Sequence, residues 1–413
     1  MMAPTLEGMP AELRILILLN IPDIQSLISI VRASPVFYQT YVAARQDILN
    51  ALVKRQFDHV DIAEAIAAVR SVGLHARTAS NKEEIIALLD RRRRSRETII
   101  QQQSTADMSM SPTNEPANCA ESVRLLLLSA RANFFMEDYC RTIPCPPWVD
   151  NTRWASEVLP LRLSDSEKAR FLRAFYRLQT YCNIFGVPEN DPDGGSRWFD
   201  TFDADEMWDL FFGTMPPWEV EEFGCMWAYL RRKYTRIFEE IALYSSRFKE
   251  DRPDTTSPAC FELYPDSLED REHRDRMISL GPSFLYKVLY QESPAKRRDL
   301  VATNLSGSHA TWTDLLLLAG GNDRFLIYPA EKYDVDDVQD VLRTLPPLER
   351  PNHAWVRFWF GDGPITNVRL DEMYDAMVGG QKGWEWGYAW WDRERLIEWQ
   401  ALGLYLGGRL TSA

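Results

Sequence analysis

The spacing of apolar residues predicts two long amphipathic helices in the middle of the chain. The first opens with Ser164 and Glu167 in a capping-box pattern, and apolar residues follow at steps of three and four. Its opposite side is polar and carries Arg170, Arg173 and Arg177. The second helix follows Pro216 and Pro217, with acidic residues in its first turn and basic residues later, which complements the helix dipole.

Shorter elements are predicted in the C-terminal third. Two helices should begin after Pro282 and Pro294. Residues 325–328 and 355–360 combine aromatic and β-branched side chains with nearby glycine and proline, which favours strands. We therefore predict a mainly α fold, with a large irregular helical domain and minor β structure near the C-terminus.

A polar segment divides the chain. Residues 101–120 are rich in Gln, Ser, Thr, Asn and Pro, which predicts a linker. We expect an N-terminal module over 1–57, accessory helices over 58–100, and a helical, Trp-rich domain over 121–413.

The first predicted helix of the N-terminal module is apolar on every side. Pro10 suits its first turn, and Leu13, Ile17 and Ile21 follow at steps of four residues. The positions between them are also apolar, so this helix must be buried on more than one side. A module of about fifty residues holds too little core to cover it, so an apolar surface should remain for a partner.

Two further helices complete the module. Pro22 and Asp23 end the first helix, and Asp23 can cap a second helix that carries Leu27. Ser34 and Pro35 provide the cap and the first position of a third helix. The module is therefore predicted to contain three short helices.

This order of residues resembles the F-box. The F-box pattern combines a Leu-Pro pair, a Glu-Leu pair, an Ile-Leu pair, a Leu-Pro turn, a Leu in the second helix and Ser-x-x-Phe in the third. These appear here as Met9-Pro10, Glu12-Leu13, Ile17-Leu18, Ile21-Pro22, Leu27, and Ser34 with Phe37. Met9 and Ile21 replace leucine. The resemblance covers about 50 of the 413 residues.

The resemblance implies an adaptor that recruits substrates to a Skp-cullin-F-box ubiquitin ligase. Such an adaptor needs no catalytic residue and no cofactor, because it acts by bringing a target close to other enzymes. The residues implied in docking on the Skp subunit are Pro10, Leu13, Ile17, Leu18, Ile21, Pro22, Leu27 and Phe37. The alternative is a ligase-independent interaction scaffold, in which the same helix packs against residues beyond 120.

The rest of the chain resembles a large group of F-box proteins of filamentous fungi. The segments that carry this likeness are residues 170–177, 217–219, 229–231 and 387–396. The likeness implies no particular chemistry and leaves the protein substrate undefined.

Charge and cysteine content restrict the partners and the compartment. The net charge is −13, and residues 101–413 hold 34 basic and 49 acidic residues, so nucleic acid is not an expected partner. Six cysteines without a Cys-x-x-Cys pair suit reduced thiols. No secretory signal or membrane span is expected, which indicates the cytosol or the nucleus.

Motifs for catalysis or metal binding are not found. His-Glu-x-x-His, Gly-x-Ser-x-Gly and the phosphate-binding loop do not occur, and the five histidines lack metal-ligand spacing. The acidic turn at Asp191 lacks the Glu of a calcium loop, since Phe202 takes that position. A hydrolase would need a cleft that gathers a histidine with Ser, Cys or Asp.

Two further features each have two interpretations. The basic run Arg91 to Arg94, with Arg96, is either a nuclear-import patch or a solvated helix end. Seven of the 14 tryptophans lie from Trp355 onward, and they either fill the core of the helical domain or form an exposed substrate face. The residues of this possible face are Trp384, Trp386, Trp390 and Trp391.

Overall fold

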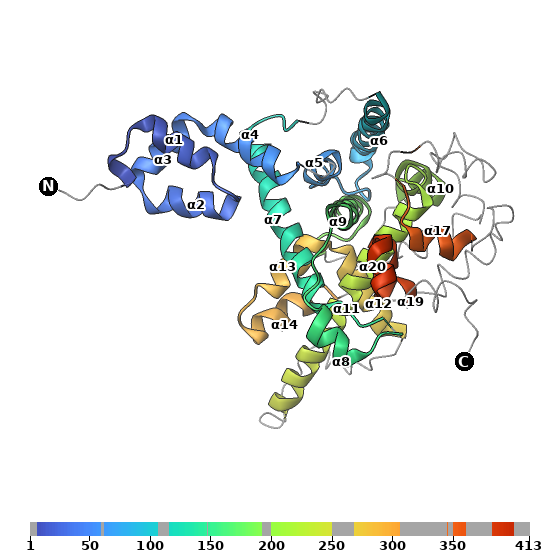
Figure 1. Cartoon of the computed structure of the whole chain (residues 1–413). Helices are drawn as coiled ribbons and strands as arrows, with labels where there is room; N and C mark the ends of the chain where they lie inside the picture. Colours follow the sequence, from blue (N-terminus) through green and yellow to red (C-terminus); the bar gives the residue numbers. More distant parts are fainter. Residues whose placement is uncertain are drawn as a thin grey trace.

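The computed structural model is mainly helical, as the sequence predicts (Figure 1). It describes residues 6–58, 62–105, 115–146, 148–191, 200–249, 268–305, 345, 350–360 and 382–399. Within these ranges no strand is present.

The N-terminal module consists of α1 (Ala11–Leu19), α2 (Ile24–Ala33), α3 (Pro35–Ala43) and α4 (Arg45–Gln56), preceded by a short 3₁₀ turn, η1 (Leu6–Gly8). The predicted caps form. The Asp23 carboxylate accepts a hydrogen bond from the Ser26 N–H at 2.8 Å, and the Ser34 hydroxyl accepts one from the Phe37 N–H at 3.3 Å. Figure 1 shows α1, α2 and α3 grouped at one end of the molecule, with α4 leading toward α7.

The accessory helices pack on the large domain. They are α5 (Ile62–Arg70), η2 (Ala79–Asn81) and α6 (Lys82–Thr105), and α5 lies against both α9 and α7. Helix α6 continues to Thr105, so its end occupies the first positions of the predicted linker. Arg92, within the basic run, is buried beside Glu64 and over the Phe211 ring, which gives this part of the run a structural role.

Three long helices form the centre of the large domain: α7 (Cys119–Thr142), α9 (Asp165–Phe185) and α11 (Pro217–Lys249). The capping box at the start of α9 is confirmed, with both Ser164–Glu167 hydrogen bonds present. Apolar side chains predicted to line α9 and α11 meet in the core, including Phe175 and Leu230 at 0% exposure. The surrounding elements are α8 (Asn151–Arg153), η4 (Trp154–Val158), α10 (Ala204–Met207), η6 (Trp208–Phe212), α12 (Leu268–Ser279), α13 (Pro282–Leu289) and α14 (Pro294–Ala302).

The polar side of α9 is not exposed to solvent. Arg177 is completely buried and lies 2.8 Å from the Glu64 carboxylate of α5 and 2.5 Å from the Glu219 carboxylate of α11. Arg173 pairs with Glu222 of α11 at 2.7 Å. These ion pairs join the accessory helices, α9 and α11, because both of these buried arginines face carboxylates of neighbouring helices.

The C-terminal segment forms a cap over α9 and α11. It contains α17 (His353–Phe360), α19 (Lys382–Glu385), η10 (Tyr388–Trp390) and α20 (Arg393–Glu398). The strand predicted over 355–360 is wrong, because this segment is helical in α17 and the Asn352 side chain caps it by accepting from the Trp355 N–H at 2.8 Å. The other predicted strand, 325–328, lies outside the described residues.

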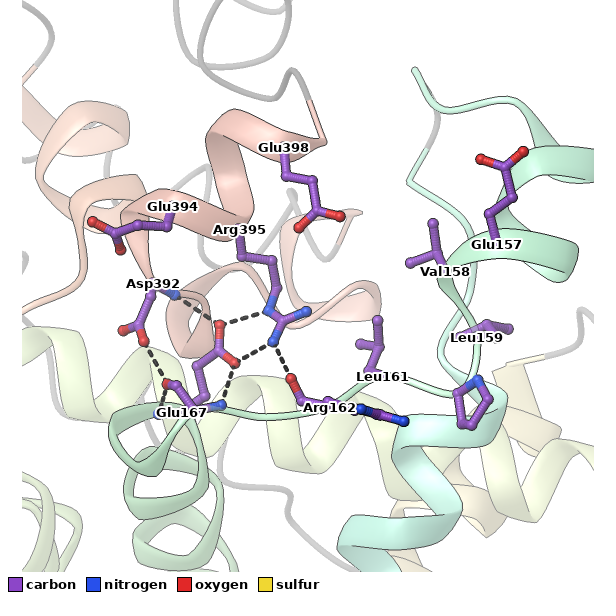
Figure 2. Close-up of a pocket in the computed structure, with 12 residues that line it drawn as sticks. Glu157, Val158, Leu159, Leu161, Arg162, Glu167, Asp392, Glu394, Arg395 and Glu398 are labelled. Atoms are coloured by element: carbon purple, nitrogen blue, oxygen red, sulfur yellow. Dashed lines mark hydrogen bonds and ion pairs between the residues drawn. The ribbon is translucent and has the colours of Figure 1, made fainter.

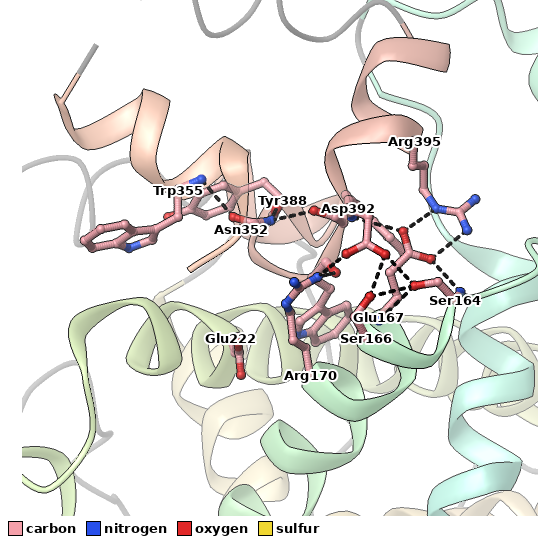
Figure 3. Close-up of polar contacts among 12 residues, drawn as sticks. Ser164, Ser166, Glu167, Arg170, Glu222, Asn352, Trp355, Tyr388, Asp392 and Arg395 are labelled. Atoms are coloured by element: carbon pink, nitrogen blue, oxygen red, sulfur yellow. Dashed lines mark hydrogen bonds and ion pairs between the residues drawn. The ribbon is translucent and has the colours of Figure 1, made fainter. Parts of the chain in front are cut away.

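Polar contacts fix the cap to the start of α9 (Figure 3). The Arg170 guanidinium donates to the Asp392 carboxylate at 2.8 Å, and Arg395 donates to both oxygens of Glu167 at 2.6 Å each. The same Glu167 side chain closes the capping box of α9. One carboxylate therefore organises both the helix start and the docking of the cap.

Candidate docking surface

Helix α1 is held in the module by its C-terminal end. Arg55 of α4 donates to the Leu19 carbonyl at 2.8 Å, and Gln56 donates to the Pro22 carbonyl at 2.8 Å. Since the last carbonyls of a helix have no partner within it, the bond to Leu19 satisfies a group that would otherwise need water, and the bond to Pro22 holds the turn after α1. Leu18 is completely buried on this side. Helix α1 is thereby fixed with one side against α3 and α4.

The other side of α1 presents apolar side chains to solvent. Leu13 is 47% exposed and Leu16 is 53% exposed. The neighbouring helix α3 adds Tyr38 and Val42, which lie one turn apart, and Leu6 of η1 is exposed as well. We call these five residues the α1–α3 apolar set. Within the described parts of the chain, they are five of nine exposed large apolar residues, so exposed apolar side chains concentrate in the module.

The structure divides the eight predicted docking residues into two groups. Pro10, Leu13 and Pro22 are exposed and Ile17 is half-buried. The other four are below 9% exposure and form the core of the module, so they offer almost no area to a partner: Leu18, Ile21, Leu27 and Phe37. The prediction that these four side chains contact a docking partner directly is therefore corrected: they stabilise the module from inside.

Four members of the apolar set were not predicted from the sequence. Leu6, Leu16, Tyr38 and Val42 are exposed, yet none belongs to the F-box residues quoted above. A helix that is apolar all round gives no signal for which side its own module covers. In α3, the spacing of four residues between Tyr38 and Val42 places them on one side, away from the buried Phe37.

Among the described residues, the later part of the chain leaves Leu13 and Leu16 uncovered. The main packing partners of α1 are α3 and α4, whereas α2 and α4 contact α7. Figure 1 shows the same arrangement, with α1 and α3 farther from the large domain than α4. The scaffold hypothesis requires α1 to pack inward, and the exposure of Leu13 and Leu16 does not fit that requirement.

The predicted substrate face is not available at the surface. Trp384, Trp386, Trp390 and Trp391 are all buried, at 4% exposure or less. Their rings pack on α7, α9 and one another; the Trp390 ring lies 4.9 Å from those of Tyr139 and Phe171. The tryptophans therefore fill the core, and the interpretation of these four residues as a recruiting face is wrong.

The titratable side chains of the described residues do not form a metal site, and three cysteine thiols are buried. No group of three or more His, Cys, Asp or Glu side chains in this part of the chain is placed to hold a metal ion. Burial raises the pKa of the Cys140 thiol to about 11 and raises the pKa values of the Cys182 and Cys225 thiols well above the usual range. These three thiols are therefore protonated at neutral pH.

The chain matches no protein-family model, no curated protein and no solved structure. None of these comparisons therefore tests the F-box resemblance, which stays a prediction from the sequence. Across the described residues, no helix combines the length and the apolar character that crossing a bilayer demands.

The contact between the C-terminal cap and α11 contains one buried carboxyl group whose pKa is raised. Glu221 of α11 is 2% exposed and accepts a hydrogen bond from the Trp384 indole N–H of the cap. Burial raises the pKa of Glu221 to about 7, although hydrogen bonds from Trp384 and Tyr388 oppose the change. The ionised form of this group is therefore disfavoured in the folded protein.

We expect the free energy of unfolding to fall as the pH rises through about 7. The folded pKa of Glu221 lies above the usual value of 4.5, so its contribution is fully present below 4.5 and is lost as the pH passes about 7. Glu221→Gln should remove up to about 3 kcal/mol of this pH dependence. Urea unfolding of both proteins at about pH 5 and about pH 8, followed by tryptophan fluorescence, measures the difference. Glu239→Gln, at an exposed position of the same helix, is the control. An unchanged pH dependence in Glu221→Gln would contradict this assignment.

Proposed function

We propose that the chain is a substrate-recruiting adaptor of a Skp-cullin-F-box ubiquitin ligase. The supporting observation is the exposure of Leu13 and Leu16 on α1, in a module whose sequence resembles the F-box. A partner that covered these side chains would remove apolar area from water, which is favourable by roughly 25 cal/mol for each Å².

The arrangement of the module supports docking without rearrangement of the large domain. Helices α1 and α3 carry the apolar set, while α4 and α2 provide the contacts to α7. A partner helix could pack on α1 and α3 with little change in the body of the protein, and preformed surfaces of this kind reduce the cost of association. The docking group would include Leu13, Leu16, Tyr38 and Val42.

In this proposal the chain performs no bond chemistry. It would hold a target protein on its large domain and the Skp subunit on its module, so that ubiquitin transfer proceeds at a high effective concentration of the target. The proposal places the protein in the cytosol or the nucleus, with a protein target and without nucleic acid, membrane or cofactor.

The test is binding of the purified full chain to the Skp subunit. We expect a stable complex with the natural protein, and at least tenfold weaker binding for Leu13→Asp or Leu16→Asp, since about 1.4 kcal/mol corresponds to a factor of ten. Val72→Asp changes an equally apolar side chain, 67% exposed and outside the module, and should bind normally. Circular dichroism of each variant establishes that the helical fold is retained.

Failure of the natural protein to bind Skp would reject the proposal. Equal loss of binding in Val72→Asp would also count against docking through α1 and α3, because that site lies outside them.

A further inference from the structure

A cavity of about 780 Å³ lies between two segments that are distant in sequence (Figure 2). One wall is formed by residues 157–162, by Ser164 and by Glu167 at the start of α9. The other wall is formed by Asp392 and the exposed side of α20. A volume of this size is in the range of small-ligand and side-chain binding sites.

The basic groups near the base of this cavity are already matched by carboxylates. Arg395 donates to both oxygens of Glu167, whose side chain is 1% exposed. Asp392, beside them, receives the Arg170 guanidinium at 2.8 Å. Bidentate pairs of this kind hold both partners in place and neutralise their charges. Arg395 therefore does not offer an uncompensated positive charge to an anion.

The rim of the cavity carries exposed carboxylates on both walls. Glu394 and Glu398 lie one turn apart on α20, and Glu157 lies on the opposite wall. Figure 2 shows Glu398 and Glu157 on the two sides, with Val158 and Leu161 between them. Among the described residues of the lining, Arg162 is the exposed basic one, and Arg153 beside the lining pairs with Glu157 at 3.3 Å. Glu394 and Glu398 therefore give the rim its excess of negative charge.

The apolar side chains of the cavity place a second requirement on a ligand, besides a charge opposite to that of the rim. Val158, Leu159 and Leu161 give one wall an apolar strip next to the carboxylates. A ligand that fits both features has an apolar stem and a cationic end. Arginine and lysine side chains have this composition, because their methylene stems pack on apolar surface while the charged ends stay among polar groups.

We propose that this cavity binds an arginine or lysine side chain of an extended peptide segment in a partner protein. The stem would lie along Val158 and Leu159, and the cation would face Glu394 and Glu398. An acidic or phosphorylated segment would meet three exposed carboxylates and is disfavoured. The inference rests on the proposed function in one respect, since a recruited target would supply the segment.

The test is selection of a random heptapeptide display library on the purified full chain, without Skp. We expect arginine and lysine to be enriched at least about tenfold in the peptides recovered, because opposite charge on the rim favours cationic side chains over neutral and acidic ones. The double variant Glu394→Gln/Glu398→Gln should lose this enrichment. Glu83→Gln/Glu84→Gln removes two exposed carboxylates of α6 and should select the same peptides as the natural protein.

Three outcomes would overturn the inference: recovery of acidic peptides, no enrichment above the Glu394→Gln/Glu398→Gln variant, or equal loss in the α6 control. Both variants change exposed side chains, so their thermal unfolding should match that of the natural protein. The selection does not involve the N-terminal module. Loss of peptide selection with intact Skp binding therefore rejects only the cavity, and the reverse result rejects only the adaptor function.

Discussion

Replacing Arg177 with leucine should reduce the free energy of unfolding by about 3–5 kcal/mol, because removing one member of a buried ion pair leaves an uncompensated charge. Arg177 is completely buried between Glu64 and Glu219, at 2.8 Å and 2.5 Å. Leucine fills much of the volume but neutralises neither carboxylate. Urea unfolding followed by circular dichroism measures the change.

The control is Arg141→Leu. Arg141 pairs with Glu137 at 3.1 Å, but both side chains are more than 60% exposed, so this change should cost less than about 1 kcal/mol. A double variant that combines Arg177→Leu with Glu219→Gln should recover part of the loss, since it removes one buried negative charge and leaves Arg92 paired with Glu64 and Arg173 paired with Glu222. Equal destabilisation by Arg177→Leu and Arg141→Leu would contradict the prediction that burial determines how much each ion pair contributes to the free energy of unfolding.

Replacing Trp390 with alanine should cost about 3–5 kcal/mol, the usual range for a large aromatic side chain removed from a core. Trp390 is 1% exposed and meets Tyr139 of α7 and Phe171 of α9 at ring separations of 4.9 Å. We expect the cap to release from the long helices before they unfold. Chemical unfolding and limited proteolysis of the cap, measured together, test both the size and the order of the change.

Ile397→Ala is the matched control for this prediction. Ile397 is an apolar residue of the same cap, on α20, but it is 53% exposed. Its loss should change the free energy of unfolding by less than about 1 kcal/mol. Unchanged protease resistance in Trp390→Ala would mean that the Trp390 ring does not hold the cap in place.

Much of the helical architecture could be predicted from local signals. Ser164 with Glu167 and Ser34 with Pro35 mark helix starts that the structure confirms, because capping depends on residues within a few positions of each other. The segment 355–360 was predicted as a strand because its aromatic residues favour strands. A helix forms there instead, because the Asn352 side chain caps its start. The same side chain donates to the Trp391 carbonyl at 3.0 Å.

The roles of the arginines on α9 could not be predicted from the same pattern. Arg170, Arg173 and Arg177 occupy the polar side of an amphipathic helix, which normally faces water. Their carboxylate partners lie on α5, α11 and the C-terminal cap. Pairing across such sequence distances depends on tertiary packing, and spacing along one helix contains no information about it.

The candidate docking surface was only partly predictable, for a related reason. The sequence indicates that α1 is apolar on all sides but not which side the module covers. Leu13 and Leu18 have similar side chains, yet one is 47% exposed and the other is completely buried. The α20 cavity had no sequence signal, because its two walls come from segments more than 200 positions apart in the chain.

The joint between α4 and α7 has a geometric consequence. Helix α4 packs along α7 and contributes Leu49, Leu52 and Val53 to the common core. The packing of α4 on α7 therefore holds the N-terminal module in one orientation relative to the large domain. In a ubiquitin-ligase adaptor, a fixed orientation would determine which side of a bound target faces the enzyme that carries ubiquitin. The lysines on that side would be the ones modified.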